Sequence, residues 1–251
     1  MKATKLFNEF FESEKAGGLV LIACTILSLT LANSNFGVEY RDFFQFKFAG
    51  LSIAHWINDG LMAIFFLLIG LELEREIYKG ELSNFKDALF PVFGAMGGLL
   101  LPAGIYFLFN YGTATQSGIG IPMATDIAFA LGILSLLGNK VPLTLKIFLT
   151  ALAIIDDLFA ILIIAVFYTK TLVFANLFIA LGIFALLLVL NRIKVKSLIP
   201  YLIGGIAMWY FMLNSGVHAT ITGILLAFAI PFGNGDEKST SYILQHFLHK
   251  P

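Results

Sequence analysis

The sequence has little charge and a single cysteine. Only 13% of its 251 residues are Asp, Glu, Lys or Arg, whereas a soluble domain contains about a quarter. The 16 basic and 16 acidic residues balance, so net charge points to no particular partner. Cys24 cannot form a disulfide within the chain. The sequence shows neither a nucleotide-binding motif nor a basic patch for nucleic acid, so we expect no cofactor and no nucleic-acid partner.

Apolar residues are correspondingly abundant, at 59% of the chain with a mean hydropathy of +0.89. They gather in runs long enough to cross a bilayer as helices. We therefore predict an all-α membrane protein in which residues 1–251 form one transmembrane domain of about eight spans. The expected spans are residues 16–36, 55–77, 88–110, 119–137, 143–169, 172–190, 198–213 and 216–232.

The longest connection is residues 37–53, between the first two spans. Its segment YRDFFQFKFAGLSI, from Tyr40 to Ile53, alternates around Gly50 and predicts a small β-hairpin outside the membrane. The edge of such a hairpin can pair with a second copy of the chain. We therefore expect two kinds of partner: membrane lipid and a second copy of the chain.

The distribution of Lys and Arg predicts the orientation. With the N-terminus in the cytoplasm, only Arg41, Lys47 and Lys170 of the 16 basic residues lie on the other side. Because positively charged loops stay in the cytoplasm, we expect both termini there.

The predicted fourth span contains helix-breaking residues beside an acid. It reads GIGIPMATDIAFALGILSLLG, with Gly118, Gly120 and Pro122 just ahead of Thr125 and Asp126. An interrupted helix of this kind indicates the binding site of a transporter. The alternative is a simple proline kink, which is common in membrane helices.

Three acids lie away from the ends of the predicted spans: Asp126, Asp156 and Asp157. No Lys or Arg lies at the centre of any span, so these acids must take up a proton or bind a cation. A site that does either in turn is an exchanger of Na⁺ or Li⁺ against H⁺, and Thr125 could add an oxygen ligand. Neighbouring helical residues point about 100° apart, so we expect one of the paired acids to meet the ion with Asp126. The alternative is an acid that is protonated and purely structural.

Weaker candidates lie elsewhere. His218 could titrate near neutral pH, although a single histidine near a helix start is as often a packing residue. His246 and His249 lie at amphipathic spacing on the last segment. The acids from Glu72 to Glu76 either attract cations or form a solvated helix end.

Four motifs resemble those of NhaA-type sodium/proton antiporters. They are LIGLELERE (68–76), ATDIAFALGILSLLG (124–138), KIFLTALAIIDDLFAILIIAVFYT (146–169) and SGVHATITG (215–223). The resemblance covers essentially the whole chain and implies the N-terminal part of an inverted-repeat antiporter fold. It implies a secondary transporter, not an enzyme, that exchanges cytoplasmic Na⁺ or Li⁺ for external H⁺ in pH and sodium homeostasis. The expected location is the inner membrane of a bacterial cell.

The resemblance also implies roles for individual residues. Asp157 and Asp126 would form the Na⁺ site, with Asp156 beside them and Thr125 next to the ion on a broken fourth helix. Asp59 matches an acid on the outward-facing helix. The positions that match residues tied to pH response or the cytoplasmic funnel are Glu72, Arg75, Glu76, His246 and His249, and we place Asp59 and His218 in the same set.

The sequence departs from the family pattern in its length. Members have about twelve spans in an inverted repeat, and this chain has about eight. The missing part would hold the second broken helix and the buried lysine that pairs with the position of Asp156. Tyr242 and Gln245 stand where the family often has charged residues. We expect a truncated product, a second polypeptide that supplies the missing helices, or an incomplete record.

Three other functions stay open. The missing spans suggest a non-transporting fragment or a subunit that needs a second chain. The sequence GNGD at Gly233–Asp236 fits the pattern of an intramembrane aspartyl protease. This pattern lies in a polar loop, however, and a catalytic dyad needs convergent carboxyls. A channel would need a continuous polar helix face, which the sequence lacks.

Overall fold

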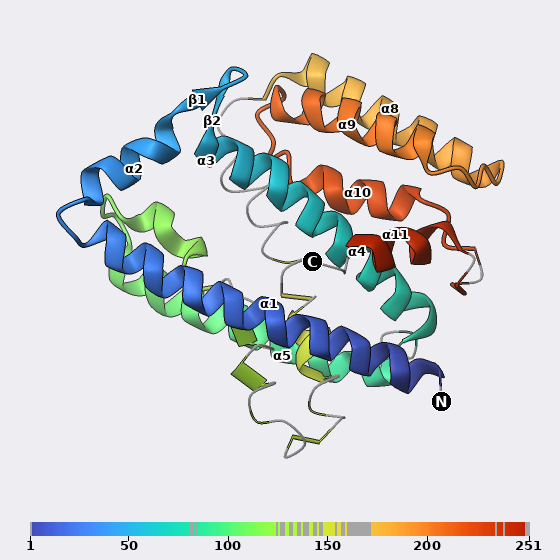
Figure 1. Cartoon of the computed structure of the whole chain (residues 1–251), viewed down its shortest axis with the longest axis horizontal. Helices are drawn as coiled ribbons and strands as arrows, with labels where there is room; N and C mark the ends of the chain where they lie inside the picture. The colour runs from blue at the N-terminus through green and yellow to red at the C-terminus, as the bar shows by residue number, and fades with distance from the viewer. Residues whose placement is uncertain are drawn as a thin grey trace. The chain divides into compact units, whose positions relative to one another are not determined.

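The structure is a computed structural model of the whole chain. It describes residues 2–80, 83, 85–123, 125, 129–130, 133–134, 137, 141–142, 145, 148–153, 155–156, 159, 172–233, 235–237 and 239–248, and most of these are helical (Figure 1). The chain divides into two compact units. The first is made of Met1–Leu19 and Glu76–Tyr168, and the second of Val20–Arg75 and Thr169–Pro251.

The elements follow one another as a series of helices interrupted by one short strand pair. In chain order they are α1 (Lys2–Ala32), α2 (Gly37–Gln45), β1 (Lys47–Phe48), β2 (Leu51–Ser52), α3 (Ile53–His55), the π-helix η1 (Trp56–Leu61), α4 (Met62–Lys79), α5 (Phe85–Asn110), the 3₁₀ helix η3 (Gln116–Gly120), α8 (Phe174–Arg192), α9 (Ile199–Leu213), α10 (Ile221–Ala229) and α11 (Thr240–Leu248).

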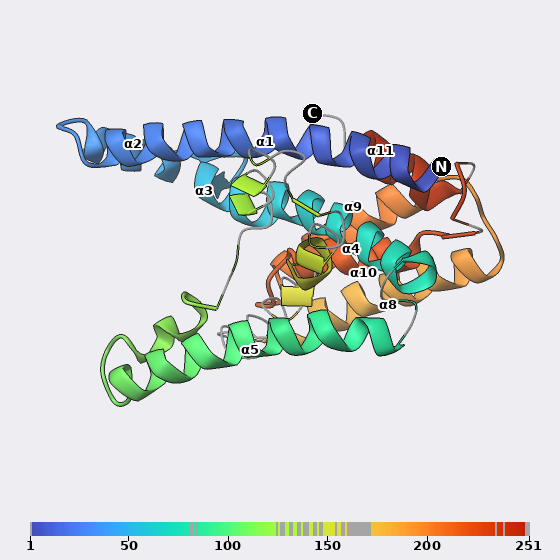
Figure 2. The same cartoon turned by 90° about the horizontal axis from the view of Figure 1, so that it is seen from below.

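The first unit is organised around α5, a long apolar helix (Figure 2). Leu99 and Ala103 of α5 are buried together with Met123, and Ile119 and Phe159 pack against these three residues. Because Met123 and Ile119 belong to the predicted fourth span, this cluster fastens the start of that span to α5.

A second set of contacts joins α5 to the predicted fifth span. The rings of Phe90 and Phe148 lie 4.9 Å apart. A Cβ at Gly94 would lie 3.1 Å from the Leu152 side chain, so the small residue lets residues 148–153 approach closely. The predicted fourth and fifth spans are thus both held on α5.

The second unit contains three helices packed on one another. α8 lies against α9, and α10 contacts both. The Val173 N–H donates to the Ser215 carbonyl, and the Asn176 side chain donates to the Asn214 carbonyl, both at 2.8 Å. These bonds join the start of α8 to the end of α9, so the two helices run antiparallel (Figure 1).

Glycines bring α10 close to α4. A Cβ at Gly70 of α4 would lie 2.6 Å from the Ala227 Cβ. A Cβ at Gly223 of α10 would fall on the backbone of Ala63 and Leu67. Small residues permit such close approach in membrane helices, and here they hold α10 against α4 at successive turns.

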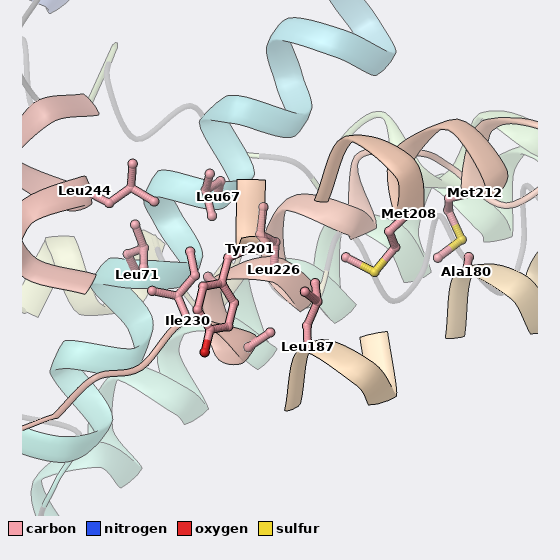
Figure 3. Packing of buried hydrophobic residues seen from close by; sticks show 12 residues of the cluster. Leu67, Leu71, Ala180, Leu187, Tyr201, Met208, Met212, Leu226, Ile230 and Leu244 are labelled. Atoms are coloured by element: carbon pink, nitrogen blue, oxygen red, sulfur yellow. The ribbon is translucent and has the colours of Figure 1, made fainter. Parts of the chain in front are cut away.

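The core of the second unit is apolar and takes side chains from α4, α8, α9, α10 and α11 (Figure 3). Its buried members are Leu67, Leu71, Ala180, Leu187, Tyr201, Met208, Met212, Leu226, Ala227, Ala229, Ile230 and Leu244. The one phenol in this set, Tyr201, donates its hydroxyl to the Val195 carbonyl at 3.0 Å. Its ring can therefore be buried without leaving a polar group unsatisfied.

Several helices are apolar and long enough to cross a membrane. In the described part of the chain these are Ile53–Lys79, Leu89–Asn110 and Phe174–Arg192. The pair Gly17–Ala32 and Gly37–Gln45, bent by 114°, would add a fourth if it forms one span. These helices overlap the first, second, third and sixth predicted spans, apart from Gly37–Gln45, which lies in the connection after the first span. They indicate a membrane protein. Much of the predicted fifth span, from residue 160 to 169, lies outside the described residues.

The prediction of a hairpin from Tyr40 to Ile53 is wrong for its first part. Gly37–Gln45 form helix α2. Tyr40, Phe43 and Phe44 recur at the three- and four-residue spacing of a helix, and the alternation of aromatic and polar residues concealed it. The Tyr40 hydroxyl donates to Ser28 of α1 at 2.7 Å and ties α2 to the preceding helix.

Strand pairing is limited to β1 and β2. Lys47 lies opposite Ser52, and Phe48 lies opposite Leu51. Between them Ala49 and Gly50 have φ values of 50° and 86°. Two successive positive φ values are typical of the tight turn that joins antiparallel strands.

The eighth predicted span, residues 216–232, contains a much shorter helix. Only Ile221–Ala229, the nine residues of α10, are helical. Gly216 has a φ of 87°, which a continuous helix does not contain. Ile230 is extended because the residue before a proline, here Pro231, is disfavoured in the helical region.

Candidate ion-binding site

The predicted fourth span does not begin as a regular α-helix. Gln116–Gly120 form a 3₁₀ helix, residues 121–123 lie in turns, and Thr125 lies outside any helix. Helical backbone occurs beyond, at residues 129–130 and 133–134. Pro122 contributes to the interruption because it lacks a backbone N–H. The Thr125 amide is therefore available to a partner outside its own segment.

That partner is Asp156. The Thr125 hydroxyl donates to Asp156 Oδ2 at 2.5 Å, and the Thr125 N–H donates to the same oxygen at 3.2 Å. Asp156 lies in helical backbone and is only 2% exposed, whereas Thr125 is exposed. The small buried residues Ala151 and Ala153 precede it on the same segment. The structure thus joins the fourth and fifth predicted spans through one acid.

The contact between Thr125 and Asp156 can stabilise a negative charge on Asp156, and its oxygen atoms are of the kind that bind cations. A buried carboxylate loses hydration and needs compensating interactions. Two donors on one oxygen provide some, because hydrogen bonds to a charged acceptor are strong. The carboxylate and hydroxyl oxygens are also ligands that hard cations prefer. Among the described residues no group of three or more His, Cys, Asp and Glu side chains could hold a metal ion.

Three predicted site residues lie outside the part that the structure describes: Asp126, Asp157 and His249. The first two are the predicted ligands of the Na⁺ ion. Their roles, and the roles of the residues that follow, stay predictions.

A second group of predicted residues meets at the start of α4. Asp59 lies in the π-helix η1 and its side chain is half-buried. His55 and His218 lie close enough to its carboxyl group to interact with it electrostatically. The Asp59 carbonyl accepts a hydrogen bond from Trp209 Nε1 at 2.6 Å. The fold thus brings Asp59 and His218, which are distant in sequence, into one neighbourhood.

The acidic end of α4 is largely buried. Glu72 is 7% exposed and Glu74 is 4% exposed, whereas Arg75 and Glu76 are half-buried. In the described part of the chain Glu74 Oε2 has no hydrogen-bond partner. Burial of two acids argues against a solvated helix end, the alternative raised by the sequence.

The last helix presents His246 on its surface. This side chain is exposed, and its ring stacks on Tyr242 with centroids 6.1 Å apart and an interplanar angle of 9°. The spacing of four residues places both rings on one face of α11.

Gly233, Gly235 and Asp236, the described residues of the GNGD segment, lie in turns or bends between α10 and α11. Gly233 and Gly235 have φ values of 61° and 58°. The Asp236 carbonyl accepts hydrogen bonds from the Ser239 N–H at 2.9 Å and from the Ser239 hydroxyl at 2.7 Å. These two bonds hold the backbone just before α11. Asp236 therefore has a structural role there, which favours a turn over the protease interpretation.

Sequence reasoning did not single out Trp209, Trp56 or His55. A signal was present for the tryptophans, since the chain has only two and an indole N–H within an apolar run needs an acceptor. The identity of that acceptor could not be read from the sequence, because Trp209 and Asp59 are 150 positions apart.

Comparisons with known proteins agree on one family. The model of the Na⁺/H⁺ antiporter 1 family matches residues 8–251. The Na⁺/H⁺ antiporter NhaA of Flavobacterium psychrophilum is 73% identical over the whole of this chain. The corresponding proteins of Flavobacterium johnsoniae (NhaA 1) and Cytophaga hutchinsonii are 67% and 63% identical over the same extent. The chain spans 65%, 66% and 65% of the lengths of these three relatives, respectively.

Proposed function

Because the chain belongs to the Na⁺/H⁺ antiporter 1 family, we propose that it serves in secondary active transport, exchanging cytoplasmic Na⁺ for external H⁺. The relatives are named as Na⁺/H⁺ antiporters, which are transporters and not enzymes. One observation of the structure supports this function most directly. A buried acid, Asp156, takes both donors of Thr125 from an interrupted stretch of backbone.

The proposed mechanism is competition between a proton and a cation for the same carboxylates. Asp126 and Asp157 bind Na⁺ or Li⁺ when ionised and release it when protonated. Thr125 contributes an oxygen ligand. Asp156 holds Thr125 in place and so keeps the interrupted backbone open toward the ion. The site cannot bind Na⁺ and H⁺ at the same time. Movement of Na⁺ in one direction across the membrane is therefore coupled to movement of H⁺ in the other.

The proposed architecture follows the same inference. The chain crosses the inner membrane of a bacterium about eight times, with its fourth helix broken near Thr125 and both termini in the cytoplasm. This is the N-terminal part of an inverted-repeat fold, in which the ion site lies near the middle of the membrane. The excess of Lys and Arg on one side supports the orientation.

Two partnerships are proposed as well. The strand pair β1–β2 has exposed Lys47 and Phe48 on its first strand, and its edge is suited to pairing with a second copy. The relatives are longer than the part that this chain matches. We propose that the remaining part, in the same polypeptide or in a second one, supplies helices that complete the site. On its own the chain would then be a non-transporting fragment or subunit.

The experiment follows proton movement in everted membrane vesicles that contain the 251-residue chain. After a proton gradient is set, Na⁺ or Li⁺ is added and a pH-sensitive dye reports the gradient. We expect collapse of the gradient when the natural sequence is co-expressed with the remaining part of a relative, and none when Asp157→Asn replaces it, because the amide can neither release a proton nor bind Na⁺ with full charge.

Asp42→Asn is the matched control, since Asp42 is an exposed acid of α2. It should transport as the natural sequence does. Normal exchange by Asp157→Asn would contradict the proposed site. A well-inserted chain without any exchange, restored by co-expression of the remaining part of a relative, would support the partnership with further helices.

A further inference from the structure

The start of α4 contains an unusual piece of backbone that holds an acid. Residues Trp56–Leu61, WINDGL, form a π-helical turn between α3 and α4. Such turns widen the helix, displace its carbonyl groups from the regular ladder and occur frequently at functional sites. Asp59 lies inside this turn. Its backbone orientation, and hence the direction of its carboxyl group, depends on what fixes the widened turn.

Trp209 of α9 supplies an external fixation. Its indole Nε1 donates to the Asp59 carbonyl at 2.6 Å, which is short for an N–H···O bond. The indole of Trp209 stacks on that of Trp56 with ring centroids 5.9 Å apart and an interplanar angle of 25°. Trp209 therefore contacts the π-helical turn at two points, once through a polar bond and once through a ring face.

The ring of Trp56 lies along the turn. A Cβ at Gly60 would be 3.4 Å from this ring, an ordinary contact distance. Trp56 donates its own N–H elsewhere, to the Phe48 carbonyl of β1 at 3.0 Å. The two tryptophans thus share one stack, but only Trp209 bonds to Asp59.

Two histidines are near the carboxyl group of Asp59. His218, in the segment before α10, and His55, at the end of α3, both interact with it electrostatically. The Nδ1 of His55 lies 2.7 Å from the hydroxyl of Ser52, which is buried and fixes that ring. His218 comes from a part of the chain far from Asp59 in sequence. The strength of its coupling to Asp59 therefore depends on how the two backbones are held.

We propose that Trp209 is a positioning residue for Asp59, holding the π-helical turn that carries its carboxyl group. The inference rests on the proposed function and on the prediction that Asp59 is among the residues tied to pH response or the funnel. Trp209 itself touches no transported ion in this proposal. Without its indole N–H, the widened turn would relax toward a regular helix and move the carboxyl group relative to His218.

The test measures coupling between Asp59 and His218 directly. A membrane-permeant carbodiimide attacks protonated carboxyl groups. Its reaction with Asp59 is followed by peptide mass spectrometry over a pH series, on the full chain in lipid vesicles. His218→Gln is introduced into three backgrounds: the natural sequence, Trp209→Phe and Trp56→Phe. Trp56→Phe is the matched control because it removes one indole N–H from the same stack without touching the Asp59 carbonyl.

We expect His218→Gln to displace the labelling profile of Asp59 by about half a pH unit in the natural and Trp56→Phe backgrounds. In the Trp209→Phe background the displacement should disappear. An equal displacement in all three backgrounds would overturn the proposal. Labelling requires no transport, so a failure of Na⁺-dependent exchange in everted vesicles would count against the proposed function alone.

A second measurement does not depend on the folding of Trp209→Phe. In Trp56→Phe, Trp209 is the one remaining tryptophan of the chain, and a protonated imidazole quenches a nearby indole. Its emission should show a pH-dependent step that is lost in Trp56→Phe/His218→Gln and displaced in Trp56→Phe/Asp59→Asn. Emission that is unaffected by both substitutions would contradict the placement of Trp209, Asp59 and His218 in one coupled group.

Discussion

The two units of the chain join their segments in different ways. In the first, the fourth and fifth predicted spans meet through a polar contact, the two hydrogen bonds from Thr125 to Asp156. In the second, α4 and α10 meet where Gly70 and Gly223 remove the side chains between them. One contact consists of hydrogen bonds to a carboxyl group, whereas the other consists of close packing without polar side chains.

This difference matches the demands of the proposed transport function. A site that exchanges a proton for a cation must contain groups that change their bonding during the cycle. A scaffold must keep its geometry while they do so, and close packing between backbones has no titratable group to disturb. We therefore expect the second unit to respond to changes of volume and the first to changes of polarity.

The largest effect is expected for Gly223→Ala. The new methyl group would collide with the backbone of Ala63 and Leu67, which a rotamer change cannot relieve. We expect a loss of about 3 kcal/mol in folding free energy, the upper end for overpacking, seen as a lower unfolding midpoint in detergent. Gly182→Ala is the control, since its Cβ would meet nothing within 4 Å on α8. Similar unfolding midpoints for Gly223→Ala and Gly182→Ala would show that close packing at Gly223 does not contribute to stability.

A smaller effect is expected for Thr125→Val. The substitution keeps the volume and the backbone N–H but removes the hydroxyl donor to Asp156. A hydrogen bond to a charged group contributes about 1.5–3 kcal/mol, so the Na⁺ concentration for half-maximal exchange should rise about tenfold. The measurement is a Na⁺ titration of dye recovery in everted vesicles. Thr113→Val, at an exposed threonine of the same unit, should leave the titration unchanged.

The smallest effect is expected for Ser215→Ala in the second unit. Ser215 is 0% exposed, and its hydroxyl donates to the Met212 carbonyl at 2.7 Å and accepts from the Val217 N–H at 3.2 Å. The Ser215 hydroxyl bonds only to residues close to it in sequence, at the end of α9, and does not connect two helices. Loss of these bonds should lower stability by about 1 kcal/mol, measured by the unfolding midpoint.

Ser34 provides a matched comparison for Ser215. It makes the same two bonds, to the Leu31 carbonyl at 2.8 Å and from the Phe36 N–H at 3.1 Å, but it is exposed. Ser34→Ala should cost less, because water replaces the lost partners. Equal losses at both serines would show that burial does not set the strength of this contact.

Much of the helical architecture could be predicted from the sequence. The long apolar runs predicted helices where α5, α8 and α9 occur, because such runs are stable in a bilayer only as helices or closed barrels. Local patterns were less reliable where two periods overlapped. The aromatic residues of α2 fit both an alternating strand and a helix, and Pro231 and Gly216 shortened α10 within an otherwise apolar run.

The candidate site was partly predictable for a similar reason. Acids within apolar runs are conspicuous, since a carboxylate is costly there, and Thr125 stood out beside Pro122. That Thr125 gives both of its donors to Asp156 could not be predicted, because spacing along a chain does not state which side chains converge. The same holds for the bond from Trp209 to Asp59 across 150 positions.

The sequence by itself determined that this is a membrane protein and that its long apolar segments are helical, and it marked the acids that are candidates for ion binding. Each inference follows from the cost of placing polar groups in lipid. The family also followed from its motifs. Only the tertiary structure decided which groups meet: Thr125 with Asp156, Trp209 with Asp59, and Gly223 with α4. These contacts arise from the packing of whole helices, which depends on the summed fit of many side chains.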